Sequence, residues 1–196
     1  MASHSKNVEI ERKFLVDSNA FETEKQDNSY RFAVIQQGYW TPENLPAVFE
    51  QALRQLSDSI EHRDYAILQE LGTDHLEMRV RQSDEDYYVT FKGRKSLSTG
   101  GIHEFEYKLP EKWAVSLLNS CDFLISKTRY YVPLDDNLTI EVDAFNHLDG
   151  LVMAEVEIPS IHTVLPALPS WIGEEVTGNE TYYNRSLAER HKKPNS

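Results

Sequence analysis

Cysteine is almost missing from this chain. Cys121 is the single cysteine among 196 residues, which excludes an internal disulfide and any zinc site built from several cysteines. Long apolar stretches are missing too: none approaches the roughly 20 residues that a membrane helix needs. No charged and then apolar leader opens the chain. We therefore expect a cytoplasmic protein that works in a reducing setting and does not bind a membrane.

Positive charge is in short supply. The chain has 20 Lys and Arg against 32 Asp and Glu, a formal net charge of −12. A general nucleic-acid binder normally carries a basic footprint, so we expect no nucleic-acid partner. Small anionic ligands stay possible, because the local field inside a concave site matters more than the net charge.

Several common catalytic motifs are also absent. The sequence contains no Gly-x-Ser-x-Gly elbow and no Gly-x-x-x-x-Gly-Lys phosphate loop, and its seven histidines show no metal-ligand spacing. Cys121 lies at the end of a predicted helix beside Leu118 and Phe123, so we assign it to the core and not to a nucleophile.

What the sequence has is strand-like alternation. It predicts eight strands, at about 7–17, 30–41, 75–82, 86–93, 102–109, 125–132, 138–145 and 151–159. Helices are predicted over 45–60, 110–120 and 181–191 and a brief one over 160–168, while 63–71 is ambiguous and 95–101 and 171–178 are assigned to loops. No linker divides the chain, so we expect one α+β domain over 1–196 with a helical insertion at about 45–71.

The charged residues of these strands fall at every second position, so each set shares one face of its strand. The opposite positions are largely apolar. The acidic pairs are Glu9 with Glu11, Glu104 with Glu106, Glu141 with Asp143, and Glu155 with Glu157. The basic residues are Lys13, Arg79, Arg81, Lys92, Lys127 and Arg129. A solvated sheet face would explain the alternation, but not this sorting by sign, because neighbouring like charges repel unless a ligand offsets them.

An eight-stranded antiparallel sheet can close around one small ligand. With the charges inside and helices packed outside, such a β-barrel would form a polar tunnel. Its carboxylate pairs suit a hard divalent cation such as Mg²⁺ or Mn²⁺. Its basic pairs suit phosphate groups. Together they indicate a site for a polyphosphate.

The ordered set resembles the triphosphate tunnel metalloenzymes, also called the CYTH family after adenylate cyclase and thiamine triphosphatase. Their Glu-x-Glu-x-Lys signature stands here as Glu9-Ile10-Glu11-Arg12-Lys13, and a closing segment begins at Glu175-Val176-Thr177-Gly178. The resemblance implies an eight-stranded tunnel that binds a triphosphate with one or two divalent metal ions. It covers nearly the whole chain.

By this resemblance each site residue receives a role. The metal ligands would be Glu9, Glu11, Glu141, Asp143, Glu155 and Glu157, and the phosphates would be held by Lys13, Arg79, Arg81, Lys92, Lys127 and Arg129. Glu104 and Glu106 would orient the cations. The catalytic residues would be Lys13, Glu155, Glu157 and Tyr39, although Tyr39 is equally well read as a packed tyrosine. Thr181 stands where the family often has a basic residue, and Arg185 is one replacement for it.

The residues leave several functions open. The first is a metal-dependent hydrolase of inorganic triphosphate. The alternatives are an enzyme acting on an organic triphosphate (thiamine triphosphatase, nucleoside triphosphatase or class IV-type adenylate cyclase) and a polyphosphate sensor without turnover. An organic substrate needs a stacking side chain, for which Trp40, Tyr87, Tyr88 and Tyr131 are candidates. The insertion at 45–71 is a lid, a homodimer surface or inert.

Overall fold

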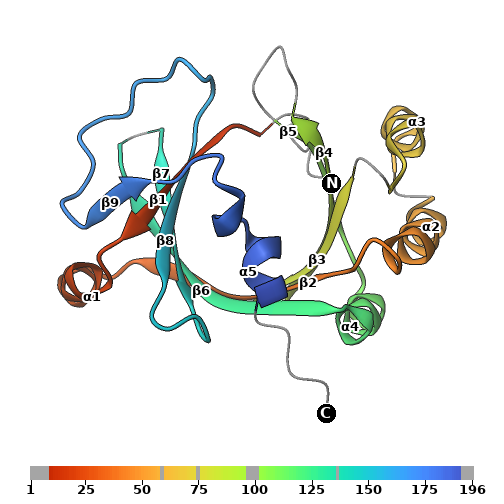
Figure 1. Cartoon of the computed structure of the whole chain (residues 1–196), viewed down its shortest axis with the longest axis horizontal. Coiled ribbons are helices and arrows are strands. Elements are labelled where there is room, and N and C mark those ends of the chain that lie inside the picture. The colour runs from red at the N-terminus through yellow and green to blue at the C-terminus, as the bar shows by residue number, and fades with distance from the viewer. Residues whose placement is uncertain (1–8, 58–59, 74–75, 96–101, 136, 191–196) are drawn as a thin grey trace. The chain divides into compact units, whose positions relative to one another are not determined.

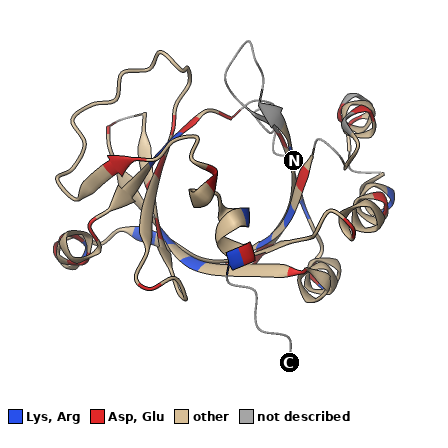
Figure 2. Cartoon of the chain, viewed as in Figure 1, with Lys and Arg blue, Asp and Glu red and all other residues tan. Residues whose placement is uncertain are grey.

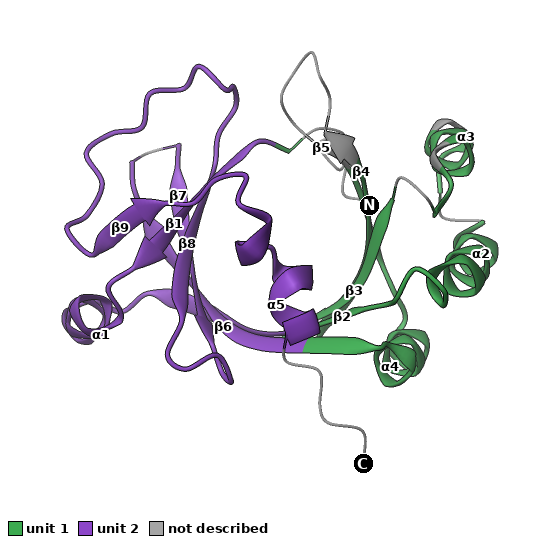
Figure 3. Ribbon diagram, in the orientation of Figure 1, with its two compact units in different colours: residues 1–9, 37–124 green, residues 10–36, 125–196 purple. Residues whose placement is uncertain are grey.

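The structure is a computed structural model, and it describes residues 9–57, 60–73, 76–95, 102–135 and 137–190. The chain forms two compact units, each built from two separate stretches of sequence (Figure 3). Unit 1 comprises Met1–Glu9 and Gln37–Leu124, and unit 2 comprises Ile10–Gln36 and Ile125–Ser196. Both are α+β, as predicted. No helix in the described ranges is long and apolar enough to cross a membrane.

Unit 1 contains three strands, the end of a fourth and three helices (Figure 1). Its elements are α2 (Leu45–Leu56), α3 (His62–Leu71), β3 (Glu77–Ser83), β4 (Asp86–Lys95), β5 (Ile102–Lys108) and α4 (Glu111–Ser120), together with the last residues of β2 (Arg31–Tyr39). The strands lie in the order β5-β4-β3-β2. The β3–β4 and β4–β5 pairs are antiparallel.

The core of unit 1 lies on the apolar face of these strands. Met78 and Val80 alternate with the arginines of β3, so both apolar side chains point to the same face. Helix α2 covers that face with Leu45, Phe49 and other residues at helical spacing. The predicted insertion is therefore part of this core. In Figure 1 the three helices of the unit lie on one side of its strands.

Unit 2 carries the remaining elements. They are β1 (Glu11–Val16), α1 (Ser18–Asp27), most of β2, all but the first two residues of β6 (Phe123–Pro133), β7 (Thr139–Phe145), β8 (Val152–Glu157), β9 (Ile172–Glu175), the 3-10 helix η2 (Glu180–Tyr182) and α5 (Asn184–Arg190). The strand order is β2-β6-β7-β8-β1-β9. A second core packs Phe14, Phe21, Val142, Val156 and Trp171 on one face of these strands.

The sequence missed helix α1, which lies between the first two strands. Its N-terminus is capped by Asp17, whose Oδ1 accepts hydrogen bonds from the backbone N–H groups of Asn19 and Ala20, each at 3.0 Å. Phe21 is the helix's one fully buried residue, and its ring packs 5.0 Å from that of Trp171. A single apolar anchor gives too weak a periodicity to predict a helix.

Two predictions near the C-terminus are wrong. The stretch predicted as a loop at 171–178 contains β9, which pairs antiparallel with β1. Ile172 is the one large apolar residue of β9, so its sequence shows no apolar alternation. Gly173 allows the backbones of β9 and β1 to lie close together, because a Cβ on Gly173 would lie 3.2 Å from the Leu15 carbonyl oxygen. The predicted brief helix at 160–168 is turns and irregular chain. The ambiguous stretch 63–71 is helical, and most of the predicted loop at 95–101 lies outside the described residues.

The closed eight-stranded barrel is not confirmed. The structure has nine strands instead of eight, and among the described residues β5 and β9 each pair with a single neighbouring strand. The extra strand is β9, which pairs with β1 and lies within the stretch that the sequence predicted as a loop.

Candidate active site

The predicted charged residues form two clusters, one in each unit, and Figure 2 shows both signs of charge along the strands. The unit 2 cluster consists of Glu11, Lys13, Lys127, Arg129, Glu141, Asp143, Glu155 and Glu157. The unit 1 cluster consists of Glu9, Arg79, Arg81, Thr90, Lys92, Glu104 and Glu106.

Strand register assembles the unit 2 cluster. Lys13 pairs with Glu155, Glu155 with Glu141, and Asp143 with Arg129, across the consecutive strands β1, β8, β7 and β6. Residues paired directly across antiparallel strands point to the same face. The apolar neighbours of these residues face the opposite way, into the second core. The predicted separation of a charged face from an apolar face is therefore present in this unit.

Asp143 is the counter-ion of two buried cations. Its Oδ1 accepts from Arg129 Nε at 2.7 Å, and its Oδ2 accepts from Arg129 Nη2 at 2.7 Å and from Lys127 Nζ. Burial and the neighbouring Arg129 lower the pKa of Lys127 to about 8, although Asp143 opposes this shift. Burial disfavours the charged form of Asp143 itself, but Arg129 and Lys127 hold its pKa below the ordinary value.

Glu155 connects this network to the signature lysine. It accepts from Lys13 Nζ at 2.7 Å and from Arg129 Nη2 at 2.9 Å. Burial disfavours the charged carboxylate, but Lys13 and Arg129 hold its pKa well below the ordinary value. Burial likewise disfavours the Lys13 ammonium, yet the carboxylates of Glu155 and Glu11 keep its pKa above the ordinary value.

Two cross-strand pairs in this cluster bring carboxylates together. Glu11 lies opposite Glu157, and Glu141 lies opposite Glu155. Burial raises the pKa of Glu141, and Glu155 and Asp143 add to that rise although Arg129 opposes it. Like charges directly opposite each other destabilise a sheet unless a cation separates them. Carboxylate oxygens are the donors that a hard divalent cation prefers.

Lysine and arginine side chains form ion pairs with the carboxylates of Glu11, Glu141, Asp143 and Glu155 in the unit 2 cluster. Within the described ranges no three Asp, Glu, His or Cys side chains are grouped in a way that could hold a metal ion. Asp143 fits a metal ligand least, because both of its oxygens accept from Arg129 and one also accepts from Lys127.

The unit 1 cluster is assembled in the same way. Register places Arg79 beside Thr90, Thr90 beside Glu106, and Lys92 beside Glu104. Arg79 Nη2 lies 3.2 Å from Glu104 Oε1, and Arg81 Nη2 lies 2.7 Å from Glu106 Oε2. Each of the two carboxylates thus pairs with one of the two arginines, and the supporting role predicted for Glu104 and Glu106 stays a prediction.

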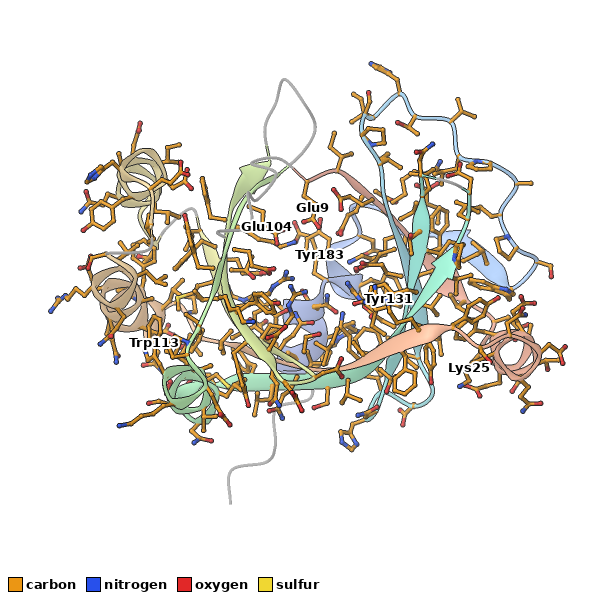
Figure 4. All side chains as sticks on the ribbon, turned by 180° about the vertical axis from the view of Figure 1, so that it is seen from behind. Glu9, Lys25, Glu104, Trp113, Tyr131 and Tyr183 are labelled. Atoms are coloured by element: carbon orange, nitrogen blue, oxygen red, sulfur yellow. The ribbon has the colours of Figure 1, made fainter. Side chains whose placement is uncertain are left out.

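Two carboxyl groups of unit 1 share one cation. Lys92 Nζ lies 2.7 Å from Glu9 Oε2 and 2.8 Å from Glu104 Oε2, and Figure 4 shows Glu9 and Glu104 next to each other. Burial and a hydrogen bond with Glu9 raise the pKa of Glu104 to about 7. Burial also disfavours charge on Glu9, but the hydrogen bond with Glu104 and the charge of Lys92 lower its pKa to about 2. As the pH falls, Glu104 therefore takes up a proton before Glu9 does.

Comparison with known proteins identifies the family. No family model matches the chain. It is 34% identical over 121 residues to an inorganic triphosphatase of Nitrosomonas europaea, covering 59% of this chain and 77% of that protein. It is 40% identical over 114 residues to an inorganic triphosphatase of Acetivibrio thermocellus, covering 56% of this chain and 70% of that protein. The chain belongs to the triphosphate tunnel metalloenzyme, or CYTH, family. The resemblance predicted from the sequence is confirmed.

A solved structure extends the similarity over nearly the full length. The crystal structure of an inorganic triphosphatase matches 95% of this chain and 97% of its own, with 29% sequence identity and a TM-score of 0.54. The likeness to a triphosphate tunnel metalloenzyme therefore includes both compact units.

Tyr39 is buried at the end of β2 within unit 1. Its hydroxyl accepts from Gln37 Nε2 at 3.0 Å. Tyr39 interacts electrostatically with Arg79, and it therefore lies near the unit 1 cluster. Its predicted catalytic partner Lys13 belongs to unit 2, so the pairing of these two residues stays a prediction.

Cys121 is partly buried beside the core to which the sequence assigned it. It lies against the first apolar core, and its Sγ donates to the Leu118 carbonyl at 2.9 Å. Burial raises the pKa of the thiol to about 11, which keeps the reactive thiolate scarce at neutral pH. Gly38 lies close to it: a Cβ on Gly38 would stand 2.8 Å from Cys121 Sγ.

Sequence reasoning missed two hydroxyl groups that hold charged residues. Thr90 Oγ1 accepts from Arg79 Nε at 3.2 Å and donates to Glu106 at 2.9 Å. The sequence did contain a signal for this role, because Thr90 stands two residues before Lys92 and therefore shares its face of β4. Thr177 Oγ1 accepts a hydrogen bond from the backbone N–H of Lys13. In the sequence, only the closing-segment motif indicated a role for Thr177. Arg185, one replacement for the missing basic residue at Thr181, bonds Glu189 at 3.0 Å.

Proposed function

We propose that this protein hydrolyses a phosphoanhydride bond of inorganic triphosphate with the help of Mg²⁺ or Mn²⁺. The observation that carries the proposal is the alternation of opposite charges across the strands of each unit, in a chain related to inorganic triphosphatases over most of their length. We further propose that residues 1–196 are a single triphosphate tunnel domain, as the family implies.

The cations of the two clusters would hold the phosphates. Arg129 offers a planar guanidinium, and Lys13 and Lys127 offer ammonium groups that now rest on carboxylates of the same unit. Arg79, Arg81 and Lys92 would do the same from unit 1. A triphosphate would replace those carboxylates as the partner of each cation. Positioning and charge stabilisation supply most of the catalysis in phosphoryl transfer.

The carboxylates would then be free for metal. Glu11, Glu157, Glu141 and Glu155 are our first choice as ligands, because the cross-strand pairs bring their like charges together. Glu9 is the candidate ligand of unit 1. A divalent ion bound there would polarise the phosphate oxygens and the attacking water. Glu155 and Glu157 are the candidates to accept the proton of that water. We assign Asp143 to the cations instead.

The aromatic side chains favour the inorganic substrate over an organic one. Trp40 and Tyr87 are buried in the core of unit 1, so neither presents a ring to a base or a thiazolium. Tyr131 is stacked under Arg31, whose Cζ lies 3.8 Å from the ring centroid. The Tyr88 ring is covered by Arg81, whose Cζ lies 5.4 Å from the ring centroid.

Phosphate release tests the proposal. We expect turnover of inorganic triphosphate with Mg²⁺ or Mn²⁺ and none with a chelator, and slower turnover of ATP and thiamine triphosphate. Glu155→Gln should lower kcat/KM by about 10² to 10³, while Glu50→Gln, on the exposed face of α2, should leave it unchanged. Tight binding of triphosphate without turnover in either metal would identify a sensor, and faster turnover of an organic triphosphate would identify that substrate class.

The cytoplasmic location and the homodimer stay predictions. Sedimentation of the full chain tests the second of them.

A further inference from the structure

Lys13 lies in β1 between two strands. On one side it pairs with Glu155 of β8. On the other side its carbonyl accepts from Val176 N at 2.8 Å, and its N–H donates to Thr177 Oγ1 at 2.9 Å. A threonine side chain therefore completes the ladder two residues beyond the end of β9.

The Thr177 hydroxyl is held in place by an ion pair. Because its oxygen accepts from Lys13 N–H, its own hydrogen is directed to Glu175 Oε1, at 2.8 Å. Arg12 donates two hydrogen bonds to the same carboxylate. Its Nε donates to Oε1 at 2.9 Å, and its Nη2 donates to Oε2. A paired fork of this kind fixes direction as well as distance. The orientation of the hydroxyl is thus specified by Arg12 and Glu175.

The chain then turns back toward the side chain of Lys13. Gly178 has a φ of +77°, and Asn179 N donates to the Val176 carbonyl at 3.0 Å, which closes the turn. The 3-10 helix η2 follows, and after it the Tyr183 ring lies 5.7 Å from Lys13 Nζ. We call residues 175–183 the closing segment; Figure 4 labels Tyr183 on it. It contacts Lys13 at the backbone and at the ammonium.

We propose that the closing segment is a clamp that positions Lys13, with Thr177 as the positioning residue that fixes its backbone. The proposal rests on the proposed function, in which the Lys13 ammonium contacts the triphosphate. A lysine side chain has many rotamers and presents a point charge, so its placement depends on a fixed strand. The hydroxyl takes the place of a backbone acceptor, because β9 ends at Glu175 and the carbonyl of Val176 accepts from Asn179 N instead of Lys13 N.

The first experiment removes only that hydroxyl. We expect Thr177→Val to lower kcat on inorganic triphosphate about tenfold, the equivalent of one partly buried hydrogen bond lost, with the metal concentration for half activation unchanged. Thr177→Ser keeps the hydroxyl and should restore kcat to within about twofold. The control is Thr23→Val, which removes an exposed hydroxyl that donates to the Asn19 carbonyl of α1. Equal kcat values for Thr177→Val and the wild-type protein would overturn the clamp.

The second experiment asks whether Thr177 acts through Lys13. In a Lys13→Met background Thr177→Val should cause no further loss of kcat, whereas its effect on the melting temperature should be the same in both backgrounds. A loss of kcat that multiplies with that of Lys13→Met would overturn the clamp, because Thr177 would then act independently.

The third experiment does not depend on turnover. Amide hydrogen exchange at Lys13 should be about tenfold faster in Thr177→Val than in the wild-type protein and unchanged in Thr177→Ser. If the wild-type protein fails to hydrolyse any triphosphate, the proposed function fails while this measurement still decides the clamp. An unchanged exchange rate in Thr177→Val would refute it.

Discussion

Replacing Asp143 by asparagine gives the sharpest test of the unit 2 cluster. The carboxylate is 1% exposed and accepts three hydrogen bonds from Arg129 and Lys127. Asparagine keeps the shape and one acceptor oxygen but removes the charge. Arg129 keeps Glu141 and Glu155 as partners, whereas Lys127 loses its ion pair with Asp143.

The expected loss of unfolding free energy follows from these ion pairs. Removing one partner of a buried ion pair costs about 3 to 5 kcal/mol. Since Arg129 stays paired, we expect the lower end, about 3 kcal/mol, in the free energy of unfolding of Asp143→Asn. Loss of the neighbouring negative charge lowers the pKa of Lys127 further below about 8. Lys127 then deprotonates near neutral pH and no longer binds phosphate as a cation.

Urea unfolding and steady-state kinetics measure the two consequences. We expect the loss of stability in a chelator-containing buffer, and a fall in kcat/KM of about 10² on inorganic triphosphate, because Arg129 and Lys127 lose their orientation. The control is Asp149→Asn, an exposed turn residue with a φ of +47° that asparagine tolerates.

Two results would refute the reasoning. A loss of stability below about 1 kcal/mol would mean that the buried network contributes little more than a surface pair. Weaker binding of Mn²⁺, measured by electron paramagnetic resonance, with an unchanged KM at saturating metal would make Asp143 a metal ligand and not a counter-ion.

Three further predictions concern packing, pH and a helix cap. Gly38→Ala should lower the free energy of unfolding by about 1 to 3 kcal/mol, because its Cβ would meet Cys121 Sγ at 2.8 Å; chemical denaturation checks this, and adding Cys121→Ala should restore part of the loss. The folded-state pKa of Glu155 is depressed, so its contribution to stability is present above its unfolded value of about 4.5 and lost as the pH falls through the folded value. Glu155→Gln should therefore flatten the acid limb of stability against pH. Asp17→Ala should cost about 1 kcal/mol of stability through the lost cap of α1, with kcat unchanged.

Local sequence determined which face of each strand carries charge. Side chains alternate along a strand whatever the tertiary structure, so Arg79 with Arg81 and Glu104 with Glu106 share a face wherever β3 and β5 lie. The apolar spacing of α2 likewise predicted its buried side. Helix α1 and strand β9 were not predictable, because one has a single buried residue and the other an exposed, mostly polar edge sequence.

Only the tertiary structure decided which charge meets which. Alternation placed six acids and cations on the charged face of β6, β7 and β8, but register alone put Asp143 against Arg129 and Glu155 against Lys13. The contact between the Lys13 backbone and the Thr177 hydroxyl joins residues 164 positions apart. No local pattern encodes such a contact, since it exists only once β9 has been hydrogen-bonded to β1. The kind of chemistry was therefore readable from the order of residues, whereas the partner of each charged group depended on long-range pairing of strands.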